Sequence, residues 1–419
     1  MPIDIDTITA EATAGNLDAQ VQLAELYDHG FGVMQDPANA VYWYRKAAEL
    51  GSVKAQRRLG KMYATGRGVC RDYLNAVYWL SRAANQDDAG AQASLAWCYQ
   101  QGLGLEKDIQ QASKWYLRAA TLGHAGARYN LGYMYANGSG VVQNQKEALR
   151  WYRLAAEQGH TKAQLNAAIM YLQGIGTEKN ESEGARLYQL AAEQGYVKAQ
   201  YNLAMLYASG YGVPQNDETA YKWLLEAANK GYARAQFNLA LAYIYGLGID
   251  QDYEKAIMWL RRSANQNYAK AYYQLGYLTG EGLGLPRDEK ESAKFFRLAA
   301  NLGYPRAQYR LGRLYDRGKG VNRDPVAAHY WYTQAANQGH SKSQFILGLN
   351  YVGRNGNRSR PDLIRACAWL SLAAKDNNSK HISFLNKLAL KLKTEELQQA
   401  KDLADALLKD HTAETKSIA

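Results

Sequence analysis

Few side chains in this sequence could form a group that carries out covalent chemistry. The seven histidines and three cysteines include no His-Glu-x-x-His segment and no Cys-x-x-Cys pair, so neither common zinc-binding spacing is present. Gly-x-Gly pairs recur, but no Gly-Lys-Ser/Thr follows them and no strand is expected before them, as a phosphate-binding loop requires. No grouping of Ser, His and Asp stands out. The sequence therefore predicts a protein without catalytic activity, bound metal or cofactor.

The individual cysteines and histidines are better explained by local structure. Cys98 takes the place of a leucine or methionine on an apolar helix face, so we expect it to be buried, whereas Cys70 lies in a loop. His124, His160 and His340 each follow a glycine that ends a helix, and we expect them to be exposed loop residues.

A repeat of 36 residues organises most of the chain. Tyrosines recur at this spacing from Tyr27 to Tyr243, and Trp43 begins a tryptophan series with the same step. The pair Gly30 and Gly32 returns in eight further copies, and no insertion disturbs the frame from about residue 16 to 351. Spacing this regular indicates an array of repeated helical units rather than two or three unrelated domains.

Each unit is predicted to form two helices. Ala19, Leu23 and Tyr27 lie at the spacing of one helical face, and Gly30 supplies the left-handed conformation that ends a helix. The second helix begins at Asp36, a position that holds only Asp or Asn in the next eight units, as expected of a side chain that caps a helix. A hairpin of this length cannot bury its own apolar stripe, so successive units must stack.

We predict an all-α solenoid of about ten 36-residue helix-turn-helix repeats, with capping helices at both ends. Residues 1–15 are predicted to form an N-terminal capping helix, residues 16–377 ten repeats, and residues 378–419 closing helices and a frayed tail. No run of about 18 apolar residues that could span a membrane occurs. Because the chain begins without a basic, apolar leader and has only three irregularly spaced cysteines, we expect it in the cytoplasm.

The units share a pattern that resembles the Sel1-like repeat, a relative of the tetratricopeptide repeat: A-x-x-x-L-G/A-x-x-Y-x-x-G-x-G-V-x-x-D-x-x-x-A-x-x-W-Y-x-x-A-A-x-x-G. The resemblance covers about nine tenths of the chain. It implies a right-handed superhelix in which first helices line a concave groove and second helices lie outside. It also implies a non-catalytic adaptor in signalling, protein quality control or bacterial host interaction. Some exported members carry paired cysteines in every repeat, and this sequence lacks those pairs.

Two variable positions of the first helix are predicted to face that groove. We call them the 21-type and 25-type positions, after Val21 and Glu25, and they recur every 36 residues. In the middle of the array they hold apolar and aromatic residues, which give a large contact area with few rotatable bonds. The predicted groove residues are Trp97, Tyr129, Tyr133, Tyr201, Met205, Phe237, Leu241, Tyr273 and Tyr277. An alternative interpretation, in which the 21-type aromatic residues pack on the preceding unit, remains open.

A row of cations borders these positions. It occupies the 18-type position, named after Asp18, and the predicted basic edge consists of Lys198, Arg234, Lys270 and Arg306. A positive row would attract a partner with acidic residues. The alternative is local, because each cation adjoins the carbonyl end of the previous helix, where positive charge is favourable.

The sequence thus favours a non-catalytic scaffold that binds a protein or peptide segment. Two other classes stay open. Because the sequence resembles the cysteine-rich relatives, one alternative is a drug-binding or hydrolytic protein that acts on β-lactams. The formal net charge of +11 leaves a weak electrostatic nucleic-acid binder, although this charge is dilute over 419 residues and no nucleic-acid motif occurs. We therefore expect neither nucleic acid nor a membrane as the partner.

Overall fold

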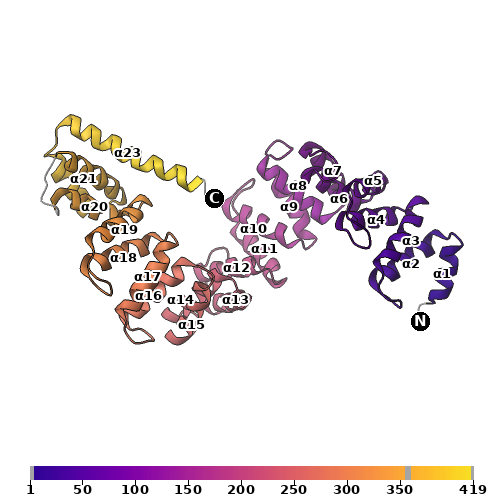
Figure 1. The fold of residues 1–419 in the computed structure, drawn as a ribbon, viewed down its shortest axis with the longest axis horizontal. Helices are drawn as coiled ribbons and strands as arrows, with labels where there is room; N and C mark the ends of the chain where they lie inside the picture. Colours follow the sequence, from indigo (N-terminus) through magenta and orange to yellow (C-terminus); the bar gives the residue numbers. More distant parts are fainter. Residues whose placement is uncertain (1–3, 354–359, 417–419) are drawn as a thin grey trace. The chain divides into compact units, whose positions relative to one another are not determined.

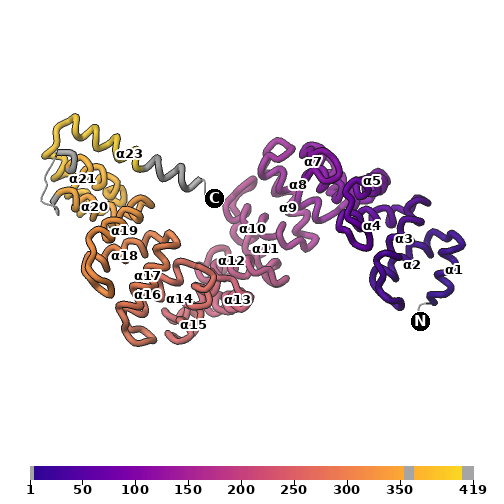
Figure 2. The backbone as a smooth tube through the Cα atoms, in the orientation of Figure 1, coloured from indigo at the N-terminus to yellow at the C-terminus, as the bar shows by residue number. Residues whose placement is uncertain are grey.

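The computed structural model describes residues 4–353 and 360–416, and all regular elements in these ranges are helices (Figure 1). The prediction of an all-α solenoid built from helix-turn-helix repeats is confirmed. The chain divides into two compact units, Met1–Gln215 and Asn216–Ala419. Within each unit the backbone runs through one hairpin after another (Figure 2).

The first unit begins with the short helix α1 (Ile5–Thr13), which packs against α2. It lies where the second helix of a preceding repeat would be, but no first helix precedes it among the described residues. Its first helices, which open the repeats, are α2 (Leu17–His29), α4 (Val53–Thr65), α6 (Ala89–Gln101), α8 (Ala125–Asn137), α10 (Thr161–Gln173) and α12 (Val197–Ser209). Its second helices are α3 (Pro37–Glu49), α5 (Tyr73–Ala84), α7 (Ile109–Thr121), α9 (Gln145–Glu157) and α11 (Glu181–Glu193).

In the second unit, first and second helices also alternate, and closing helices follow the last repeat. Its first helices are α14 (Ala233–Tyr245), α16 (Ala269–Glu281), α18 (Pro305–Arg317) and α20 (Ser341–Gly353). Its second helices are α13 (Asp217–Asn229), α15 (Tyr253–Ala264), α17 (Glu289–Asn301), α19 (Pro325–Asn337) and α21 (Arg360–Ala373). A 3₁₀ turn, η1 (Ala374–Asp376), precedes the closing helices α22 (Ser379–Ala389) and α23 (Thr394–Lys416). The predicted frayed tail includes residues 417–419, which lie outside the described residues.

Glycines end the first helices and also let repeats approach closely. Gly102 ends α6 in the left-handed region, with φ of 73°, as predicted. Gly104, two residues later, has φ of 72°, and a Cβ atom there would lie 2.2 Å from the carbonyl oxygen of Tyr73 in the previous repeat. The loop of one repeat therefore packs directly on the start of the preceding second helix, and only glycine fits.

Second helices begin at the predicted caps. Asp36 Oδ1 accepts hydrogen bonds from the backbone amides of Ala38 and Asn39, both at 3.0 Å. These bonds satisfy two of the amides that a helix start leaves unpaired.

The prediction that His124, His160 and His340 are exposed loop residues is wrong. Each is half-buried and caps a first helix, as His124 does by accepting the amide of Ala127 on Nδ1 at 3.1 Å. Burial lowers the pKa of all three imidazoles, that of His340 to about 4. The neutral ring nitrogen thereby stays available as an acceptor.

A buried glutamine links successive repeats. Gln92 Nε2 donates to the carbonyl oxygen of Ala84, near the end of the previous second helix, at 3.1 Å. The same contact, to the residue eight positions earlier, recurs at Gln20, Gln56, Gln164, Gln200, Gln236, Gln308 and Gln344. It satisfies a carbonyl that the helix end leaves unpaired.

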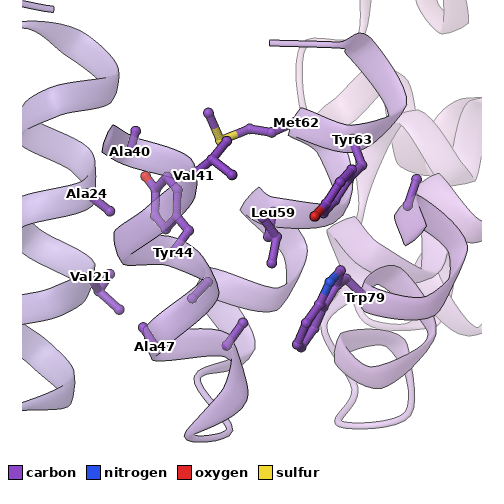
Figure 3. Close-up of a cluster of buried hydrophobic side chains, with 13 residues drawn as sticks. Val21, Ala24, Ala40, Val41, Tyr44, Ala47, Leu59, Met62, Tyr63 and Trp79 are labelled. Atoms are coloured by element: carbon purple, nitrogen blue, oxygen red, sulfur yellow. The ribbon is translucent and has the colours of Figure 1, made fainter. Parts of the chain in front are cut away.

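The apolar core runs from each hairpin into the next. In the cluster of Figure 3, Tyr44 of α3 is fully buried near Ala24 of α2, and Leu59 and Trp79 extend the same cluster through α4 and α5. Each hairpin thus buries its stripe only against a neighbour, as stacking requires. Among the described residues, no helix combines the length and apolarity that crossing a bilayer would require.

Candidate interaction surfaces

The 21-type and 25-type residues lie along the first helices, and we call the side that they occupy the first-helix face of each unit. The 25-type aromatic residues are the exposed ones: Trp97 is 44% exposed, Tyr133 49% and Tyr277 38%. The 21-type residues are covered more fully. The two positions, which the sequence analysis placed in one groove, therefore have different surroundings.

In the first unit, Trp97 borders a hollow of about 360 Å³. Lys61 of α4, Ser94 of α6, and His124 and Asn130 of the next repeat line the same hollow. Burial, with Arg57 and Arg58 nearby, lowers the pKa of Lys61, and no carboxylate of the described residues forms an ion pair with its ammonium group. The hollow thus combines an exposed indole with hydrogen-bond donors.

The predicted groove residue Tyr129 takes part in packing between repeats. Its ring stacks on His160, with centroids 4.7 Å apart, and lies 5.8 Å from the ring of Tyr152. The neighbouring predicted residues Tyr201 and Met205, on α12, are half-buried. Tyr133 is the member of this set, besides Trp97, that presents its side chain to solvent.

The second unit repeats this division. Phe237 and Tyr273 are half-buried and contact the tyrosines that begin the next first helices, Tyr268 and Tyr304, at 5.4 Å and 5.3 Å between centroids. Leu241 is half-buried, whereas Tyr277 borders a hollow of about 120 Å³. The ring contacts of these 21-type residues are made to the start of the next first helix. Packing on the preceding repeat, the alternative that the sequence left open, stays a prediction.

The predicted basic edge is exposed in both units. Lys198, Arg234, Lys270 and Arg306 all present their side chains to solvent. Among the described residues, none of the four forms an ion pair or donates a hydrogen bond to a helix-end carbonyl. Their charge is therefore available to a partner.

The asparagines beside the basic edge have partners within the array. The side chains of Asn130, Asn166 and Asn202 lie near the hydroxyls of Tyr116, Tyr152 and Tyr188, each in the previous second helix, and lower the pKa of these phenols. Burial has the larger effect and raises the pKa of Tyr116 to about 12, and the Tyr116 hydroxyl donates to Oε1 of Gln100 at 3.1 Å. These asparagines therefore face the preceding repeat.

The geometry offers little for covalent chemistry. In the described part of the chain, no three His, Cys, Asp or Glu side chains gather where they could hold a metal ion. Cys98 is buried, as predicted, and burial raises the pKa of its thiol to about 11, which disfavours the reactive thiolate.

Sequence reasoning missed two features of the first-helix faces. It did not place Lys61 and His124 in one hollow with Trp97, because these residues come from three different repeats. It also overlooked Arg310 and Arg317, although both lie on the same helical face as Arg306 and Arg313. Comparing every first-helix position between repeats would have found the second feature.

Comparison with known proteins gives a consistent result. The family model described as Sel1 repeat matches ten consecutive segments, from residues 17–52 to residues 341–378. A protective antigen of uropathogenic Escherichia coli strains, which displays an SLR fold, is 30% identical; the match covers 100% of this chain and 98% of that one, with a TM-score of 0.67. A Sel1 repeat protein from Oxalobacter formigenes is also 30% identical, over 74% of this chain and 91% of that one, with a TM-score of 0.59. A comparison with curated proteins gave no match. The chain belongs to the Sel1 repeat family.

Proposed function

We propose that this protein is a non-catalytic scaffold that binds segments of other proteins on its first-helix faces. Sel1 repeat arrays are commonly protein-interaction scaffolds. The observation that carries the proposal is the exposure of 25-type aromatic rings, such as Trp97 and Tyr277, beside hollows. Large rings that the fold does not bury are typical energetic centres of protein interfaces.

The proposed binding residues are those of the predicted groove, ordered by exposure. Trp97, Tyr133 and Tyr277 would contact the partner directly, because 38% to 49% of their surface is open. The half-buried 21-type residues would support these rings from below. We propose the cytoplasm as the compartment, which agrees with Cys70, Cys98 and Cys367 being free thiols.

Selection from a displayed library of random peptides tests the proposal. Peptides that bind the full chain are compared with two variants by fluorescence anisotropy. The test variant is Trp97→Ala/Tyr133→Ala. The matched control is Tyr42→Ala/Tyr78→Ala, which removes two rings of similar exposure, 52% and 51%, from second helices of the same unit.

We expect the test variant to lose about 2 kcal/mol, about thirtyfold in Kd, for peptides that bind the first unit. The control variant should bind as the wild type does. Far-UV circular dichroism verifies that both variants fold. The proposal is refuted if selected peptides bind both variants and a Tyr277→Ala variant with unchanged affinity, because binding would then occur away from the first-helix faces.

A further inference from the structure

Helix α18 carries four arginines on one face. Arg306, Arg310, Arg313 and Arg317 are spaced by four, three and four residues, so they follow one stripe along the helix. We call these four residues the arginine stripe. No other first helix of the ten repeats has a cation at all four corresponding positions.

Carboxylates lie near this stripe without pairing with it, since Glu281 and Glu289 line the hollow that it borders. None of its four guanidinium groups forms an ion pair with a described carboxylate. Like charges three or four residues apart on a helix repel each other and destabilise it. On α4, the residue that corresponds to Arg306 is Lys54, which lies 2.7 Å from Glu25, whereas Arg306 has no such partner among the described residues.

The stripe borders the hollow of about 120 Å³ that Tyr277 also lines. Arg310, Arg313 and Arg317 line its α18 side, and Tyr277 of α16 and Phe296 of α17 give it an apolar part. Arg310 and Arg313 are half-buried, and Arg317 is exposed. Guanidinium groups in such a setting bind carboxylates through paired, charge-assisted hydrogen bonds.

We propose that the arginine stripe and Tyr277 form a binding site for an extended acidic segment of a partner protein. The inference rests on the proposed scaffold function and specifies the partner's chemistry at one site. From the helical rise, the stripe is about 16 Å long, the length of about five residues of extended chain. Alternate residues of such a chain point to the same side, so carboxylates at every second position would meet successive arginines.

A protein segment fits this site better than a nucleic acid does. Glu281 lines the same hollow and would repel added negative charge, whereas Glu289, which also lines it, is paired with Arg287 and Lys319. In a peptide, the residues between the acidic ones can be neutral or basic. The ring of Tyr277 gives the apolar contact that such residues need.

Fluorescence anisotropy at constant ionic strength tests the inference with the full chain. The probe is a labelled peptide in which glutamate alternates with serine. A second peptide has glutamine in place of glutamate, and an oligouridylate of equal charge represents nucleic acid. The test variant is Arg310→Gln/Arg313→Gln/Arg317→Gln, and the control Arg261→Gln/Arg262→Gln/Arg297→Gln removes the same charge from second helices of the same unit.

We expect the glutamate peptide to bind the wild type at least about tenfold more tightly than the glutamine peptide or the oligouridylate. The test variant should lose that preference while the control keeps it. Melting curves should show the test variant to be at least as stable as the wild type, because like-charge repulsion has been removed. Equal binding of both peptides, equal losses in both variants, or tighter binding of the oligouridylate would each overturn the inference. If library peptides still depend on Trp97 and Tyr133 in that case, the scaffold function stands without it.

Discussion

Replacing Leu122 with glutamine is expected to stabilise the first unit, because it supplies a donor to a buried oxygen that has none. Gln92 is fully buried, and its Oε1 atom has no hydrogen-bond partner. Two repeats later, Oε1 of Gln164 accepts a hydrogen bond from Nε2 of Gln194 at 3.0 Å, and Gln194 occupies the repeat position of Leu122. The backbones also agree, with φ and ψ of −76° and 5° at Leu122 against −74° and 2° at Gln194.

The size of the gain follows from two contributions that favour the variant and one that opposes it. A buried acceptor without a partner costs about 1–3 kcal/mol, and a new neutral hydrogen bond contributes about 0.5–1.5 kcal/mol net. Ordering the glutamine side chain costs up to about 1.5 kcal/mol. Little packing is lost, because Leu122 is already 51% exposed. We expect a net gain of about 1 kcal/mol, or a rise in Tm of about 2–4 °C for a unit of this size.

Urea denaturation followed by circular dichroism measures this gain. The matched control is Leu302→Gln, at the same repeat position, because the residue that corresponds to Gln92 is Tyr272 there and offers no amide oxygen. A second control combines Leu122→Gln with Gln92→Leu, which removes the acceptor and should abolish the gain. The reasoning fails if Leu122→Gln and Leu302→Gln change stability equally, or if the gain persists without Gln92.

Two further predictions concern a loop and a helix cap. Gly104→Ala should lower the free energy of unfolding, measured in urea, by about 3 kcal/mol or more, because the new Cβ atom would clash with Tyr73. Gly51 has φ of 99° and open space around it, so Gly51→Ala should lower the free energy of unfolding only by the cost of a left-handed backbone, about 1–2 kcal/mol. Similar losses for both would show that the close approach is unimportant. Because the pKa of His340 is about 4 and its ordinary value 6.5, the unfolded chain binds a proton between these values that the folded chain does not, and stability falls as pH falls from about 6.5 to about 4. The ring is half-buried beside Lys342 and Arg306, and we expect a loss of about 1–3 kcal/mol after allowance for its partial exposure. The variant His340→Asn keeps a capping oxygen and should show a smaller loss of stability at low pH. Equal pH dependence of the urea midpoint in the wild type and the variant would contradict this prediction.

The sequence predicted the features that a single residue type carries by itself. The positions of Gly102 and Asp36 hold the same kind of residue in nine of the ten repeats, because backbone conformation and amide capping leave few alternatives. Features shared between two positions were not predicted. His160 was expected to be an exposed loop residue because it follows Gly159, which ends a helix, and its contact with Tyr129 depends on both positions together.

Exposure could not be predicted at the groove positions for a related reason. Tyr129 and Tyr133 lie on the same side of α8 and have the same side chain, yet only Tyr133 is exposed. The difference comes from His160, which begins the next first helix and stacks on Tyr129. Neighbouring repeats, which the periodic pattern does not resolve individually, decide which ring is free to bind.

The contacts that join repeats also explain where new chemistry can appear. Asn130, on α8, lies near the hydroxyl of Tyr116 in the previous second helix. The same position on α18 holds Arg310, and the residue that corresponds to Tyr116 is Phe296, which has no hydroxyl. An asparagine there would lack this neighbour. The hydroxyl alone does not decide the residue type, because Arg58 follows Tyr44 and Asn238 follows Leu224 at the same repeat positions. Phe296 also lines the hollow beside Arg310. The exchange of one tyrosine for phenylalanine thus accounts for the apolar wall that lies beside the charge of the proposed acidic-segment site.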